Sequence, residues 1–175
     1  DYLNGNLNIL KGDKPTLEDF ENHLGTIFTE VRLKQVIELR SLDTCDFGCI
    51  CNGPSFFTGL IYGCLDETYE IIKKWNKDEI MEAYFNAPKK GLNTILQDKR
   101  LIDWAKIFFA LSKKGLEKRN ELNRSGKNET IFLKHIEDII NNKKTRAEIL
   151  IEHYKKTNNL NFLANHEENF SYSGL

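Results

Sequence analysis

The chain has 175 residues, of which 40% are hydrophobic and 29% charged, and its formal net charge is −1. This composition is typical of a globular protein long enough to bury one core, and the near-neutral charge excludes a general attraction to nucleic acid or an anionic membrane. No apolar run approaches the length of a membrane span, and the start DYLNGNLNIL lacks the basic residues and apolar core of a signal peptide. We therefore expect a cytoplasmic protein that binds neither nucleic acid nor membrane.

The first predicted helix begins after Pro15. Thr16 is a suitable N-cap, and Asp19 follows it three residues later. Apolar residues then recur at helical spacing, and we expect them to pack inward as one stripe: Leu17, Phe20, Leu24 and Ile27. His23 lies away from the centre of this stripe, which favours a structural role over a direct role in a site.

The segment TEVRLKQVIELRSLD, from Thr29 to Asp43, carries the pattern most suggestive of chemistry. If residues 31–41 form a strand, one face is mostly apolar, and the other gathers three cations and a carboxylate around Val36: Arg32, Lys34, Arg40 and Glu38. A face of this kind can hold phosphate and a metal ion. The same residues also fit an amphipathic helix, or a strand whose charges are merely solvated, and periodicity alone leaves these alternatives open.

Three of the four cysteines are crowded after this segment: Cys45, Cys49 and Cys51 precede the more distant Cys64. Their spacing lacks the paired halves of a zinc site, and no histidine follows at a suitable distance. Without a secretory signal, we expect reduced thiols.

From about residue 54 to 157 the pattern becomes almost continuously helical. The predicted helices cover residues 55–65, 66–75, 77–91, 100–122, 130–144 and 145–159, separated at 123–129 by an exposed loop. Pro88 and Gly91 are expected to end the third of these helices. Thr145 and Glu148 predict a capping box at the start of the last one.

Several of these segments together resemble one enzyme family. PTLEDFENHLGTIF, EVRLK and ELRSLD match in order the block PTxxDWENHLxTxFPEVRLKxxxExRxxD, which is characteristic of glutamate–cysteine ligases of plants and many proteobacteria. Downstream, GPSFFTGLIYG, KKGLEKRN and TRAEILIEHY are similar to LPAFWxGLLYD, KDGLERRG and TPAEKLLEMY of that family. Thr29 replaces a proline and Phe20 a tryptophan. The resemblance covers almost the whole chain but only the closing third of the longer enzymes, so we expect 1–175 to be the C-terminal portion of a single catalytic domain, from a bacterial member, without its upstream part.

The resemblance implies an α+β protein, namely the mostly helical end of a glutamine-synthetase-like fold that contributes one or a few strands to an antiparallel sheet. The complete enzyme would use ATP and Mg²⁺ or Mn²⁺ to join the γ-carboxylate of L-glutamate to the amine of L-cysteine. It would form γ-glutamylcysteine, the first step of glutathione biosynthesis, through a γ-glutamyl phosphate. Because the strand at 31–41 has no predicted partner strand in this chain, we expect the 175 residues to need the upstream part and to be inactive alone.

The resemblance also implies site residues on the segment at 31–41. Glu38 is expected to bind the metal, and Arg40 to contact the transferred phosphate as catalytic residue, while Arg32 and Lys34 are candidates for nucleotide binding. Cys51 matches a position that joins a regulatory disulfide in plant members. Two alternatives stay open: a helical interaction module without chemistry, and a ligase of the same fold that uses another amine.

Overall fold

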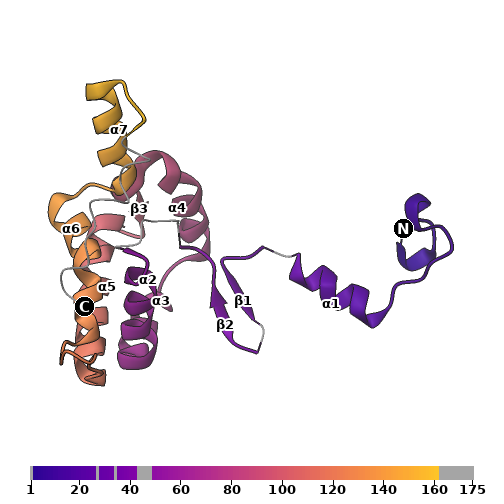
Figure 1. Cartoon of the computed structure of the whole chain (residues 1–175), viewed down its shortest axis with the longest axis horizontal. Helices are drawn as coiled ribbons and strands as arrows, with labels where there is room; N and C mark the ends of the chain where they lie inside the picture. The colour runs from indigo at the N-terminus through magenta and orange to yellow at the C-terminus, as the bar shows by residue number, and fades with distance from the viewer. Residues whose placement is uncertain (1, 27, 34, 43–48, 162–175) are drawn as a thin grey trace. The chain divides into compact units, whose positions relative to one another are not determined.

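The computed structural model describes residues 2–26, 28–33, 35–42 and 49–161. The chain divides into two compact units, Asp1–Thr44 and Cys45–Leu175 (Figure 1). In the residues described, each unit contains helices and one two-stranded antiparallel sheet, so the predicted α+β class is confirmed. The described residues do not include Ile27 of the predicted helical stripe, Lys34 of the predicted strand or Cys45 of the cysteine cluster. None of the described helices is both long and apolar enough to cross a bilayer.

In the first unit, two short 3₁₀ turns, η1 (Tyr2–Asn4) and η2 (Asn8–Leu10), precede helix α1 (Leu17–Gly25). The predicted N-cap is confirmed: the Asp19 backbone N–H donates to Thr16 Oγ1 at 3.2 Å, and the Thr16 N–H donates to Asp19 Oδ2 at 2.7 Å. This second hydrogen bond is the main reason that the pKa of Asp19 lies below its ordinary value.

The apolar stripe of α1 does not pack inward as predicted. Leu17, Phe20 and Leu24 are exposed, because no described residue of the first unit is buried to form a core against which they can pack. Helical periodicity shows that a helix has an apolar face, but it does not show what covers that face.

The single strand predicted over 31–41 is instead a hairpin of two short strands. Strand β1 (Val31–Leu33) pairs antiparallel with β2 (Ile37–Leu39), and Arg32 lies directly opposite Glu38. The backbone N–H of Arg40 extends the pairing by donating to the Glu30 carbonyl at 2.8 Å. The expectation that this segment has no partner strand within the chain is therefore wrong. Folding back lets each strand satisfy the backbone groups along one edge, which a lone strand leaves unpaired.

The second unit is mostly helical, as predicted. Its helical elements are α2 (Asn52–Thr58), the π-helical turn η4 (Gly59–Gly63), α3 (Leu65–Ile72), α4 (Lys77–Lys90), the 3₁₀ turn η5 (Gly91–Asn93), α5 (Leu101–Arg119), the 3₁₀ turn η6 (Glu129–Leu133), α6 (Lys134–Asn142) and α7 (Arg146–Thr157). The capping box of α7 is confirmed, since the Glu148 N–H donates to Thr145 Oγ1 at 3.2 Å and the Thr145 N–H donates to Glu148 Oε2 at 2.7 Å.

Two local features of this unit differ from the prediction. Pro88 lies inside the last turn of α4, which continues to Lys90 and is followed by its C-cap Gly91, where φ is +52°. A small hairpin, β3 (Ile95–Leu96) with β4 (Lys99–Arg100), precedes α5 and was not predicted. Its turn places Gln97 in the left-handed region at φ +55°.

Helix α5 is the centre of the second unit and packs against α2, η4, η6 and α6 (Figure 1). Leu116 and Ser112 of α5 are completely buried, and the Ser112 hydroxyl donates to the Phe56 carbonyl at 2.8 Å. The backbones of α5 and η4 approach so closely that a Cβ added at Gly63 would lie 2.3 Å from the Cα of Gly115. These glycines therefore set the packing distance between the two elements.

The cysteines differ in oxidation state. Cys49 is disulfide-bonded, whereas Cys51 and the buried Cys64 are free thiols. The expectation of reduced thiols holds for Cys51 and Cys64 and is wrong for Cys49. It relied on the cellular compartment, while side-chain geometry decides which thiols are able to pair.

Candidate functional site

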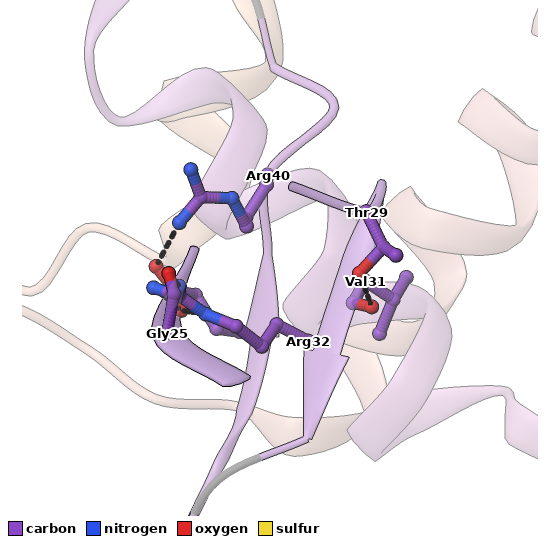
Figure 2. Close-up of polar contacts among 6 residues, drawn as sticks. Gly25, Thr29, Val31, Arg32 and Arg40 are labelled. Carbon is purple, nitrogen blue, oxygen red and sulfur yellow. Dashed lines mark hydrogen bonds and ion pairs between the residues drawn. The ribbon is translucent and has the colours of Figure 1, made fainter. Parts of the chain in front are cut away.

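The hairpin brings three of the predicted site residues together in one cluster of charges. Arg32 and Glu38 are opposite each other on β1 and β2, and Arg40 follows Glu38 by two residues, so the backbone directs all three side chains to one face. Figure 2 shows Arg32 and Arg40 reaching into the same space beside Gly25. We call Arg32, Glu38 and Arg40 the arginine–glutamate cluster.

Arg32 is the most enclosed member of the cluster, with a side chain that is 17% exposed. Its Nε donates to Glu38 Oε2 at 2.8 Å, and its Nη2 lies 2.8 Å from the same oxygen. The remaining nitrogen, Nη1, donates to the carbonyl of Gly25 at 2.9 Å. Arg32 therefore connects β2 to the C-terminal end of α1, where a cation also complements the helix dipole.

Arg40 holds the other oxygen of the same carboxylate but is less constrained. Its Nη1 donates to Glu38 Oε1 at 3.2 Å, and its guanidinium carbon lies 4.9 Å from the ring centroid of Phe28. Within the part of the chain that the structure describes, its other guanidinium N–H groups have no hydrogen-bond partner. A guanidinium has five N–H donors arranged in a planar fork, so most of those of Arg40 remain available to an anion such as phosphate.

The cluster carries two positive charges and one negative charge, and its side chains are only 17% to 36% exposed. Partial burial strengthens the attraction between charged groups relative to water. The excess positive charge beside a carboxylate suits a ligand that combines an anionic group with a cation, such as a nucleotide phosphate with its metal ion.

Glu38 fits one position in a metal site but does not form such a site by itself. A carboxylate accepts from about four directions, so ion pairs with arginine are compatible with coordination of a hard cation. Over the described ranges, no group of three or more His, Cys, Asp and Glu side chains is placed to hold a metal ion. Because Mg²⁺ and Mn²⁺ take about six ligands, the others would have to come from water, from substrate or from elsewhere in a longer protein.

The sequence pattern did not predict two groups that contact the arginine–glutamate cluster. Phe28 stacks on Arg40, and the only sequence signal for it is an aromatic residue just before the strand. The Gly25 carbonyl accepts from Arg32, and a backbone acceptor leaves no signal in the side-chain pattern. His23, also in α1, has an exposed imidazole.

Comparison with known proteins decides the family. The sequence model of glutamate–cysteine ligase family 2 matches residues 7–166, which include both the cluster and the helical unit. The chain belongs to glutamate–cysteine ligase family 2.

Curated relatives of the chain include plant proteins named glutamate–cysteine ligase. The chloroplastic glutamate–cysteine ligase of Solanum lycopersicum is 37% identical over 156 residues, which are 88% of this chain and 29% of the relative. The chloroplastic ligase of Nicotiana tabacum is 36% identical with the same coverage, and that of Arabidopsis thaliana is 35% identical over 155 residues, 87% of this chain and 28% of the relative. The chain thus spans less than a third of the length of these relatives, and the expectation of a bacterial member gains no support from them.

Proposed function

We propose that this chain is part of an ATP-dependent glutamate–cysteine ligase. We also propose that the arginine–glutamate cluster forms the part of its active site in which the phosphoryl group is transferred. Family membership over residues 7–166 supports the reaction class. The observation that carries the proposed site is the pairing of Arg32 with Glu38 across the hairpin, which places Glu38 and Arg40 on one partly buried face.

The proposed reaction has two steps. An oxygen of the γ-carboxylate of L-glutamate attacks the terminal phosphorus of ATP, so that ADP leaves and γ-glutamyl phosphate forms. The amine of L-cysteine then attacks the acyl carbon, loses a proton and displaces inorganic phosphate, which gives γ-glutamylcysteine. Both steps need positioning and charge stabilisation rather than a covalent contribution from the protein.

Arg40 is the residue of this chain suited to the transferring phosphoryl group. Its unused N–H donors present a planar fork to phosphate oxygens, and its charge offsets the negative charge that develops during transfer. Phe28 holds the guanidinium plane from one side, at 4.9 Å from ring centroid to guanidinium carbon. Arg40 therefore enters the reaction with its orientation already restricted.

Glu38 is proposed to supply one oxygen ligand to Mg²⁺ or Mn²⁺, which when bound would neutralise charge on the ATP phosphates. The nucleotide contact predicted for Lys34 remains part of the proposal. The contacts of Arg32 favour a different role from the nucleotide contact predicted for it, because its three nitrogens already face Glu38 and Gly25.

Three further parts of the proposal concern the whole protein. No described strand pairs with either outer edge of the hairpin, which supports its place in a larger antiparallel sheet of glutamine-synthetase-like fold. Since this chain spans 29% of the tomato relative, the nucleotide and amino-acid sites would require the rest of the ligase. The cytoplasmic location stays a prediction, because the relatives named above are chloroplast proteins.

The test is to change Glu38→Gln and, separately, Arg40→Met in the full-length ligase and to measure γ-glutamylcysteine formation. We expect kcat to fall about 10²-fold or more in each variant, as when one preorganised electrostatic contact to a transition state is removed. Thermal unfolding checks that both variants remain folded. Unchanged turnover in both would contradict the proposed site and would favour a helical interaction module.

A further inference from the structure

The two arginines of the cluster make different use of their donors. All three nitrogens of Arg32 face acceptors in the same unit, namely Glu38 Oε2 and the Gly25 carbonyl, at 2.8 to 2.9 Å. Among the described residues, the guanidinium of Arg40 makes a single hydrogen bond, at 3.2 Å. An arginine whose three nitrogens each already meet an acceptor gains less from a phosphate than an arginine with more unused donors, which gains new charge-assisted hydrogen bonds.

Arg32 also bridges two elements that the hairpin alone does not connect. Gly25 is the last residue of α1, and carbonyls in the last turn of a helix have no partner inside the helix. By donating to that carbonyl with one nitrogen and holding Glu38 with the other two, Arg32 fixes the carboxylate relative to the end of α1. Its side chain is the least exposed of the three, at 17%, so water competes weakly for these contacts.

We propose that Arg32 is a positioning residue that orients the Glu38 carboxylate and does not contact the nucleotide. This inference rests on the proposed function, since it gives Arg32 a role in the same site. Arg32 sets the direction in which Glu38 presents its oxygens to the cation, and Arg40 alone of the two contacts the transferred phosphate. Groups that orient a metal ligand in this way affect metal affinity about 10- to 100-fold.

Lysine does not replace Arg32 in this role. Its ammonium is a point charge at the end of a flexible stem, and one nitrogen cannot reproduce a planar fork that reaches Glu38 and Gly25 at once. An Arg32→Lys variant therefore keeps the charge of the cluster and loses its geometry. The variant therefore distinguishes a positioning role of Arg32, which lysine would lose, from a role in charge balance alone, which lysine would keep.

The experiment uses the full-length ligase with Arg32→Lys and Arg32→Met. Direct binding of Mn²⁺ without substrates is measured by electron paramagnetic resonance, and kcat and KM for ATP are measured separately. We expect both variants to weaken Mn²⁺ binding about tenfold or more and to lower kcat, while KM for ATP changes less than about threefold. In a Glu38→Gln background, Arg32→Lys should have little further effect, because the carboxylate that it positions is gone.

A matched control defines the background. Lys11→Met removes one exposed cation from the same unit without touching the cluster. This control should match the wild type in Mn²⁺ affinity and kcat.

A rise of about tenfold or more in KM for ATP with unchanged Mn²⁺ affinity would show that Arg32 contacts the nucleotide and would overturn the inference. The inference would also be overturned if the Arg32→Lys variant behaved as the wild type in every measurement. Failure of the proposed function is a separate result: the wild-type full-length protein would then form no γ-glutamylcysteine, whereas the Mn²⁺ titration reports on Arg32 whether or not product forms.

Discussion

At the scale of single residues, the cluster shows that one carboxylate can bind two arginines that differ in how many of their nitrogens meet an acceptor. Glu38 accepts from Arg32 through Oε2 and from Arg40 through Oε1. The first contact is enclosed and is joined by a further bond from Arg32 to Gly25, while most donors of Arg40 have no partner among the described residues. This asymmetry is the physical basis for assigning phosphate contact to Arg40 and orientation to Arg32.

Phe28 provides a prediction at this scale. Changing Phe28→Leu removes the ring that lies 4.9 Å from the Arg40 guanidinium, and a partly exposed contact of this kind is worth about 0.5–1 kcal/mol. We expect kcat/KM of the full-length ligase for ATP to fall about two- to fivefold. Phe28→Tyr keeps the ring and should retain wild-type kinetics, so equal losses in the two variants would contradict the stacking role.

At the scale of elements, the crossing of η4 over α5 depends on glycine. A Cβ at Gly115 would lie 1.9 Å from the carbonyl oxygen of Gly59, and one at Gly63 would lie 2.3 Å from the Cα of Gly115. Because backbone atoms rather than flexible side chains occupy that space, the two elements would have to separate. Close packing at this crossing therefore has no tolerance for even one methyl group.

Changing Gly115→Ala should accordingly destabilise the protein. We expect a loss of about 1–3 kcal/mol in the free energy of unfolding, the usual cost of overpacking, measured by denaturant titration. Alanine is otherwise the better helix former by up to about 1 kcal/mol. The control Gly25→Ala, with open space around its Cβ, should be neutral or slightly stabilising, and a stabilising Gly115→Ala would rule out the close crossing.

The capping box of α7 makes a prediction about pH. The backbone N–H of Thr145 donates to Glu148 and lowers the pKa of that carboxyl. A carboxyl whose pKa is lower in the folded state stabilises that state at neutral pH, and this contribution is lost as the pH falls from the ordinary value of 4.5 through the lower folded value. We therefore expect the first turn of α7 to fray over this range, as followed by Cα chemical shifts. Glu148→Gln should remove this pH dependence, and identical titrations in both proteins would contradict it.

At the scale of the whole molecule, none of the described residues of the first unit is buried, whereas the second unit has a core around α5. An isolated two-stranded hairpin is marginally stable in water. The proposed site thus lies on the part of the chain with the least support of its own, which agrees with a site that the rest of a longer ligase must complete.

The 175-residue chain alone should therefore form no measurable γ-glutamylcysteine, although its helical unit should remain folded. Product formation assayed with purified chain, ATP, Mg²⁺, L-glutamate and L-cysteine checks the activity, and circular dichroism checks the helices. Ligase activity in this chain would show that residues 1–175 hold a whole active site.

The sequence predicted the features that local rules decide. Thr16 with Asp19, and Thr145 with Glu148, mark their helix starts because a capping box uses only neighbouring residues. Both hairpins were missed. Gln35 and Val36, between β1 and β2, are not residues that usually mark turns, and Asp98 is the one residue of such a type in the turn between β3 and β4. The alternation of side chains along the segment correctly predicted that Arg32, Glu38 and Arg40 share one face. It did not predict that Arg32 pairs with Glu38, because that contact crosses the hairpin and periodicity does not report contacts between strands.

The most direct test of the central claim is a structure of the full-length ligase with a non-hydrolysable ATP analogue and Mg²⁺. We predict a Glu38 oxygen about 2.0–2.1 Å from the ion and the Arg40 guanidinium within hydrogen-bond distance of the terminal phosphate, with Arg32 still bound to Glu38 and Gly25. A nucleotide whose terminal phosphate and metal ion lie away from this cluster would contradict the account.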